Sequence, residues 1–372
     1  MDETIVLCLL SLLLSLVPPT SGQIPCPDPE DISPCTCSYD EENGQVSADC
    51  SLANVSEIYS AFNDVVWEFN TWGNVAITEL SGGIFGNVSF QHVFIMYSEN
   101  LVTIDPSFLL AMKDTLVTVS FTSGRLEDFP WDVVPQLVVI EQISLDGNAV
   151  TTVPELQSST LQSLWLRDNR ITTLQEKWIL PIFSSLALGG NPFSEFSSGF
   201  FADFGQFGSF YCQECNFGPT LNSGKLEFNT RQLWELHLEG NHITTIEAGA
   251  ISGYTAETKL NLDENSITEV KEEVFRPILE VLSSGDGIVS LLDNPIQCVC
   301  SMAWLVLNQT LLEHVVGNCE NGPSFQELDP FHFEESCMKM NPPMPGGHST
   351  WVSSHLGVIP FPRRGRPAVD RE

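Results

Sequence analysis

Apolar residues recur with one spacing through the middle of the chain. From Ile140, apolar side chains take the first, fourth, sixth, eleventh and fourteenth positions, and an Asn takes the ninth. The same spacing begins again at Leu161 and at Phe183. The fourth and sixth residues alternate as in a β-strand, so both side chains point to one side and are buried. The pattern therefore predicts a series of short strands, each followed by a turn at an Asn.

The ninth position needs a short amide because the chain turns there over a dry interior. Asn offers both a donor and an acceptor to the backbone groups that this turn exposes. Ten such positions follow at steps of 21 to 29 residues. They are Asn74, Ser98, Gly124, Asn148, Asn169, Asn191, Cys215, Asn241, Asn265 and Asn294. A single unit of this size cannot fold alone, so the units must stack into a continuous array with covered ends.

This spacing resembles the consensus of leucine-rich repeats. The resemblance implies an α/β solenoid, a leucine-rich repeat horseshoe with a parallel concave sheet and cysteine-rich N- and C-terminal caps.

The N-terminal residues predict export. The apolar run from Ile5 to Val17 is too short to span a bilayer and suits a signal peptide cleaved after Gly22, which would remove Cys8. No later run approaches 18 apolar residues, so we expect a secreted, extracellular protein without a membrane anchor. The expected organisation is a signal peptide at 1–22, an N-terminal cysteine cap at 23–60, about ten repeats at 61–296, a C-terminal cysteine cap at 297–337 and a disordered tail at 338–372.

Two groups of four cysteines flank the repeats. The spacing of Cys26, Cys35, Cys37 and Cys50 allows three pairings by itself. It resembles the N-terminal cap of extracellular leucine-rich repeat proteins, which implies bonds from Cys26 to Cys37 and from Cys35 to Cys50. The segment from Asn294 through Cys298, Cys300, Cys319 and Cys337 is similar to their C-terminal cap. That resemblance implies bonds from Cys298 to Cys319 and from Cys300 to Cys337.

Cys212 and Cys215 form a C-x-x-C motif inside a repeat. They occupy a sixth and a ninth position, so both side chains are expected to point inward. In nearly extended chain their Cα atoms would lie roughly 10 Å apart, beyond the ~7 Å limit of a disulfide. We therefore expect two buried thiols first, a strained local disulfide second and a redox site third.

The charge is strongly acidic and unevenly distributed. Fifteen basic against 48 acidic side chains give a net charge of -33, which argues against nucleic acid and anionic membranes as partners. Lys and Arg are absent before Lys113, and Arg363, Arg364 and Arg366 cluster near the other end. We interpret this Arg cluster first as part of a solvated tail. The alternatives are a protease-sensitive site and a contact for an acidic surface, including the protein's own.

Glycan acceptor motifs occur at Asn54, Asn87 and Asn308.

The sequence contains none of the familiar catalytic or phosphate-binding motifs, such as H-E-x-x-H, G-x-S-x-G or G-x-G-x-x-G. We expect no catalytic residue, cofactor or metal. The third, fifth, seventh and eighth positions of each repeat instead form an exposed strand face, and aromatic side chains there suit a protein interface. An idle solvated sheet explains any one of them equally well but the whole set less well. The predicted partner-binding residues are Trp72, Phe94, Tyr97, Trp165, Tyr211, Glu235, His237, Glu239 and Asp263.

The leader, the opening segment from Cys26 to Cys37, the run from Cys215 to Leu221 and both caps together resemble one arthropod family, the oplophorus-luciferin 2-monooxygenase non-catalytic subunits. The resemblance implies a non-enzymatic subunit that accompanies a small oxygenase, which oxidises coelenterazine. The predicted function is thus binding of an extracellular protein partner through the concave face. The alternatives are a matrix or adhesion protein and an enzyme with an unrecognised site.

Overall fold

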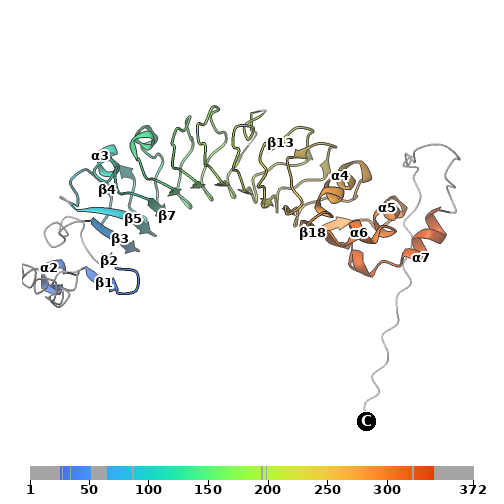
Figure 1. Ribbon diagram of the computed structural model, residues 1–372, viewed down its shortest axis with the longest axis horizontal. Helices are drawn as coiled ribbons and strands as arrows, with labels where there is room; N and C mark the ends of the chain where they lie inside the picture. Colours follow the sequence, from blue (N-terminus) through green and yellow to red (C-terminus); the bar gives the residue numbers. More distant parts are fainter. Residues whose placement is uncertain are drawn as a thin grey trace, which may run out of the picture. The chain divides into compact units, whose positions relative to one another are not determined.

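The computed structural model describes residues 26, 28–33, 35–51, 65–85, 88–193, 196–197, 199–320 and 322–338 (Figure 1). The predicted signal peptide, all of the predicted tail but Met338, and the sequons at Asn54 and Asn87 lie outside these residues. The chain divides into two compact units, residues 1–144 and 145–372. They are called the N-terminal and C-terminal units below, and each is described by itself.

The N-terminal unit begins with a hairpin and continues as a parallel sheet. Its strands, in spatial order, are β1 (Thr36–Asp40), β2 (Gln45–Asp49), β3 (Val65–Trp72), β5 (Ser89–Met96), β7 (Thr118–Thr122) and β8 (Gln142–Ser144). The remaining elements are α2 (Pro29–Ile32), the paired strands β4 (Glu79–Leu80) and β6 (Thr103–Ile104), α3 (Pro106–Leu110) and η2 (Trp131–Gln136). The β1–β2 hairpin covers the edge of β3, as expected of a cap.

The C-terminal unit continues the same plan with parallel strands. They are β9 (Ser163–Trp165), β10 (Ser185–Ala187), β11 (Ser209–Tyr211), β14 (Glu235–His237), β17 (Lys259–Asn261), β18 (Ile288–Ile296) and β19 (Val315–Cys319). In Figure 1 these strands follow one edge of the unit and the connecting loops form the other. The loop side holds the pairs β12 (Thr220–Leu221) with β15 (Thr245–Ile246) and β13 (Leu226–Glu227) with β16 (Ile251–Ser252), and helix α4 (Glu272–Leu282). The closing elements are η3 (Cys300–Met302), α5 (Ala303–Val306), α6 (Gln309–Leu312), η4 (Phe325–Glu327), α7 (Pro330–Phe333) and η5 (Glu334–Met338).

The apolar positions of the repeat form the core. Leu164 and Leu166, the fourth and sixth residues of one repeat, are fully buried, and so are Leu186 and Leu188 in the next. Phenylalanines such as Phe207 fill the interior between the sheet and the loops. The predicted leucine-rich repeat solenoid is therefore confirmed.

The ninth-position asparagines join each repeat to the one before it. Asn191 is 1% exposed, and its Nδ2 donates to the carbonyls of Leu166 and Leu188, both at 2.7 Å. Its Oδ1 accepts from the backbone N of Ile171 at 2.9 Å. The same pattern recurs at Asn169, Asn241, Asn265 and Asn294. The amide thus satisfies backbone groups of two repeats at once.

The residue before each ninth position adopts a left-handed backbone. The positive φ angles occur at Gly73, Tyr97, Ser123, Gly147, Asp168, Gly190, Glu214, Gly240, Glu264 and Asp293. Glycine enters this region freely, whereas other residues do so uncommonly. The turn therefore imposes one backbone conformation on every repeat, whatever the side chain.

Four disulfides join the cap cysteines in the expected pairs: Cys26–Cys37, Cys35–Cys50, Cys298–Cys319 and Cys300–Cys337. The first expectation for the C-x-x-C motif was wrong, because Cys212 and Cys215 also form a disulfide. The distance argument assumed extended chain, but Glu214 takes a φ of 53°, and the turn brings the two Cα atoms to 5.4 Å. Both cysteines are buried, as predicted. In this repeat a covalent bond stands where seven of the other nine repeats carry an Asn.

Replacing a ladder Asn should destabilise the protein more than replacing an exposed one. Asn191→Ala removes the amide partner of the buried Leu188 carbonyl and of the Ile171 N–H, and leaves the Leu166 carbonyl only its bond from Asn169. We therefore expect a loss of about 3 kcal/mol in the free energy of unfolding. Asn222→Ala, at an exposed position, is the control and should change stability by less than about 0.5 kcal/mol. Denaturant unfolding of the two variants measures the difference, and equal losses would contradict the ladder's role.

Thiol counting tests the fifth disulfide. All ten cysteines from Cys26 to Cys337 are bonded, so alkylation of the denatured, unreduced secreted protein should label no thiol. Mass spectrometry reads the label. Labels on Cys212 and Cys215 would show that this motif holds two buried thiols and no disulfide.

Candidate functional site

The nine predicted partner-binding residues fall into two groups, one in each unit. Trp72, Phe94 and Tyr97 belong to the N-terminal unit. The other six belong to the C-terminal unit, at outward positions of β9, β11 and β14 and in the turns after β14 and β17.

In the N-terminal unit an exposed aromatic pair stands at the ends of two strands. The rings of Trp72 and Tyr97 lie 4.5 Å apart, and the residues are 56% and 49% exposed. Tyr97 is held in the left-handed conformation of its turn. Phe94 does not join this pair but lies parallel to His92, with 6.3 Å between the ring centroids. Burial lowers the pKa of His92, although the nearby carboxylates of Glu68 and Glu141 oppose the shift.

In the C-terminal unit the fifth position of each repeat forms a row across the sheet. The strand register aligns Trp165, Ala187, Tyr211, His237, Asn261 and Ser290. Ala187 separates the two large aromatic residues, and its small side chain leaves room above the sheet. This row, called the fifth-position row, positions the rest of the site.

Arg167 occupies the space above Ala187. Its guanidinium carbon lies 5.6 Å from the ring centroid of Trp165 and 5.3 Å from that of Tyr211. Its Nη1 is 3.6 Å from Oδ2 of Asp146, and its backbone N donates to Oδ1 of Asp146 at 2.7 Å. Trp165, Arg167 and Tyr211, the aromatic–arginine cluster, combine the three residue types that most often dominate binding energy at protein interfaces.

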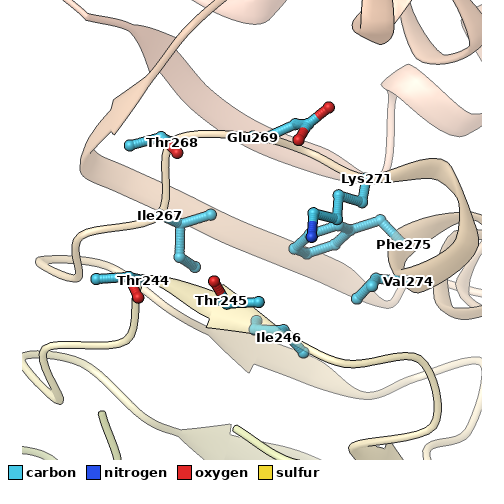
Figure 2. Close-up of a pocket in the computed structure, with 9 residues that line it drawn as sticks. All are labelled: Thr244, Thr245, Ile246, Ile267, Thr268, Glu269, Lys271, Val274 and Phe275. Atoms are coloured by element: carbon cyan, nitrogen blue, oxygen red, sulfur yellow. The ribbon is translucent and has the colours of Figure 1, made fainter. Parts of the chain in front are cut away.

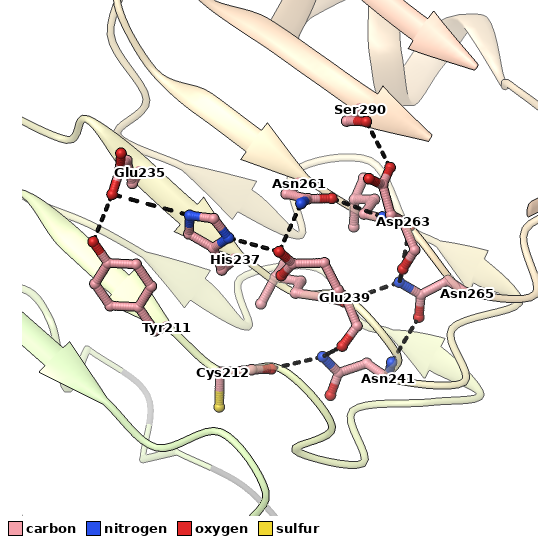
Figure 3. Close-up of polar contacts among 12 residues, drawn as sticks. Tyr211, Cys212, Glu235, His237, Glu239, Asn241, Asn261, Asp263, Asn265 and Ser290 are labelled. Atoms are coloured by element: carbon pink, nitrogen blue, oxygen red, sulfur yellow. Dashed lines mark hydrogen bonds and ion pairs between the residues drawn. The ribbon is translucent and has the colours of Figure 1, made fainter. Parts of the chain in front are cut away.

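A chain of hydrogen bonds continues from Tyr211 across the next strands (Figure 3). The Tyr211 hydroxyl donates to Glu235 at 2.5 Å, and its ring stacks on His237 at 4.9 Å. Burial, and then this bond to Glu235, raises the pKa of Tyr211. His237 Nδ1 lies 2.6 Å from Glu239 Oε1, and since an ionised carboxylate only accepts, the ring nitrogen donates. Asn261 donates to the same oxygen at 2.6 Å.

Asp263 ends this chain on the neighbouring strand. Its Oδ1 accepts from the Ser290 hydroxyl at 2.6 Å and from the Leu292 backbone N at 2.7 Å. Its own backbone N donates to Asn261. Glu235, His237, Glu239 and Asp263 are called the acidic cluster below.

Two buried polar atoms of this site have no hydrogen-bond partner within the described part of the chain. They are the indole Nε1 of Trp165, a donor, and Oε2 of Glu239, an acceptor. An unsatisfied buried polar atom costs free energy that a bound partner can recover. The aromatic–arginine cluster therefore contains one unpaired donor, and the acidic cluster contains one unpaired acceptor, among the described residues.

The carboxylates of this site take part in internal hydrogen bonds. Within the described residues no group of three or more His, Cys, Asp and Glu side chains is placed to hold a metal ion. Oε2 of Glu235, Oε1 of Glu239 and Oδ1 of Asp263 all accept hydrogen bonds from the protein itself.

A pocket of about 230 Å³ lies elsewhere in this unit, between two repeat loops and the start of α4 (Figure 2). It is lined mainly by Thr and apolar side chains, with Glu269 and Lys271 as its charged residues, and it is smaller than a typical ligand site.

Three residues of the site were absent from the predicted set: Arg167, Asn261 and Ser290. Asn261 and Ser290 bond to Glu239 and Asp263, and both occupy fifth positions. The fifth position in the repeat was a sufficient signal for Asn261 and Ser290. The predicted set held only aromatic and charged residues, so it did not include these neutral polar ones.

The stacked repeats, the ladder and the paired caps define a leucine-rich repeat protein with disulfide-bonded cysteine caps. Its sequence is similar to the oplophorus-luciferin 2-monooxygenase non-catalytic subunit of Oplophorus gracilirostris, with 29% identity over 350 residues that cover 85% of this chain and 89% of that protein. This similarity confirms the resemblance seen in the sequence. Decorin of Rattus norvegicus is 34% identical over 125 residues, 32% of this chain and 33% of decorin. No family model matches the chain.

Two solved structures are similar in part. One is a chain from an octameric complex of Latrophilin 3, Unc5D and FLRT2 (LRR), at 15% identity and a TM-score of 0.44, covering 81% of this chain and 98% of that one. The other comes from the LRIM1/APL1C complex, at 12% identity and a TM-score of 0.41, covering 62% and 44%. Among the described helices, none is long and apolar enough to cross a membrane.

The carboxyl group of Asp146, which contacts Arg167, should make the stability of the protein depend on pH. Burial raises the pKa of Asp146, although its contacts with Arg167 oppose the shift. The folded state therefore binds a proton at a higher pH than the unfolded state, and stability is gained as pH falls through the raised pKa towards 3.8. We expect the wild type to gain stability over Asp146→Asn across this window. Denaturant unfolding at a series of pH values gives both curves, and parallel curves would contradict the assignment.

Proposed function

We propose that this chain is a non-enzymatic extracellular binding subunit that holds a protein partner on the strand face of its C-terminal unit. The aromatic–arginine cluster is the anchor. The observation that carries the proposal is the buried indole donor of Trp165. It has no hydrogen-bond partner among the described residues and lies beside an arginine held between two aromatic rings. A partner group that accepts hydrogen bonds, such as a carboxylate or a backbone carbonyl, would satisfy this donor.

The similarity to a protein named as a non-catalytic subunit supports the non-enzymatic part of the proposal. The five disulfides support an extracellular location, because such bonds persist in oxidising compartments. By the same similarity, a small oxygenase is the first partner to test. The N-terminal pair of Trp72 and Tyr97 is proposed as a second contact, since large exposed aromatic pairs suit interfaces.

The sequon at Asn308 is compatible with a glycan. Its Oδ1 caps α6 by accepting from the Leu311 backbone N at 3.3 Å. A glycan on Nδ2 would leave this oxygen free to accept, so the cap would survive modification.

Capture from the native tissue fluid tests the anchor. The wild-type chain, immobilised, should retain a specific partner, and Trp165→Ala with Arg167→Ala should weaken that partner's affinity by at least about tenfold, as loss of a hot spot does. Trp234→Ala is the matched control because Trp234 is exposed but occupies a second position, outside the strand face. Binding isotherms of the captured partner give the affinities.

Two results would contradict the proposal. Equal affinities for the wild type and the double variant would remove the anchor from the interface. Oxidation of the luciferin by the purified chain alone would overturn its non-enzymatic character.

A further inference from the structure

The chain separates its charges along the sequence. Residues 339–372 hold five of the 15 Lys and Arg but only two of the 48 Asp and Glu. Three of these cations, Arg363, Arg364 and Arg366, fall within four positions. The C-terminal segment is thus positive, while the rest of the chain is strongly negative.

The acidic cluster keeps some acceptor capacity, although one oxygen of each of its carboxylates is already bonded within the protein. The side chain of Glu235 is 37% exposed, and that of Glu239 is 20% exposed with its buried Oε2 lacking a partner in the described structure. The exposed carboxylates of Glu264 and Asp293 follow at neighbouring eighth positions. The nearest cation in these strands, Lys259, is exposed and lies directly opposite Glu235 in the register of β14 and β17. It carries one positive charge against five carboxylates, so this part of the face stays negative. This part of the face is therefore suited to a positively charged ligand.

Guanidinium groups match these acceptors. An arginine donates up to five hydrogen bonds in a planar fork, and its bonds to carboxylates are stronger than neutral ones. Three arginines in close sequence can reach Glu235, Glu239 and Asp263 on adjacent strands, which lie about 4.8 Å apart.

The segment can also reach the face. Strand β19 pairs with β18, β18 with β17 and β17 with β14, so the C-terminal cap lies about 15 Å from the strand that carries Glu235 and Glu239. Cys337 is fixed to this cap by its bond to Cys300. Arg363 follows 26 residues later, and a coiled chain of that length has an end-to-end distance of roughly 28 Å.

We propose that the Arg363–Arg366 segment binds the acidic cluster of its own chain. A tethered segment meets its site at an effective concentration on the order of millimolar, so modest ion pairs are enough to hold it. The contact requires no partner and uses none of the aromatic–arginine cluster. It would leave the aromatic–arginine cluster free.

Trypsin digestion of the full secreted chain tests this contact. Cleavage after Arg363, Arg364 and Arg366 is followed by intact mass. We expect Glu235→Gln with Glu239→Gln and Asp263→Asn to speed this cleavage about tenfold at low salt, since ion pairs are strongest there. The control variant, Glu155→Gln with Glu176→Gln and Glu257→Gln, removes three exposed carboxylates elsewhere in the same unit and should cleave like the wild type.

A second measurement needs no variant. Raising NaCl to about 0.5 M should speed cleavage of the wild type to the rate of the triple variant, because salt screens the contact. A free peptide of residues 357–372 corrects for the effect of salt on trypsin. Equal cleavage rates for wild type and triple variant, or no salt effect beyond the peptide's, would overturn the proposal. If the wild type loses its protection from trypsin when the protein is diluted tenfold, the segment that binds comes from a second copy, and the proposal is overturned.

Discussion

The asparagine ladder is the interaction on which the rest of this structure depends. Each ladder Asn satisfies carbonyl groups of its own repeat and of the one before it, and it accepts an N–H from that earlier repeat. Because these groups are buried, loss of any ladder Asn leaves a buried backbone atom without a hydrogen bond and destabilises the fold. The ladder therefore fixes the register between repeats, and the register fixes which side chains share a row on the exposed face.

The fifth-position row follows directly from that register. Trp165 and Tyr211 lie on strands that flank β10, so the gap between their rings depends on the small Ala187 and on Arg167, which fills the space. A shift of one residue in any strand would turn these side chains into the core. The site is thus a consequence of the repeat geometry, and no separate loop has to build it.

Most of the fold could be predicted from the sequence because its information is periodic. Leu164, Leu166 and Asn169 reveal their roles by spacing alone, and the strand face follows from the positions between them. The Cys212–Cys215 bond could not be predicted this way, because it depends on the left-handed backbone at Glu214. Nor could spacing show that the predicted face residues fall into two groups, or that Phe94 lies beside His92 and not in the Trp72–Tyr97 pair.

The Cys212–Cys215 disulfide shows how the ladder tolerates exceptions. At this repeat Cys215 cannot supply an amide, yet Asn241 still donates to the Cys212 carbonyl and accepts from the Phe217 backbone N. The neighbour therefore completes its own half of the ladder, and the covalent bond holds the turn that an Asn would otherwise hold. Tyr211 precedes this cross-linked turn by one residue, so the bond also restrains the strand end that carries the aromatic–arginine cluster. A rigid strand end would lower the entropy lost if a partner binds at the proposed anchor, so under the proposed function this disulfide would aid recognition as well as folding.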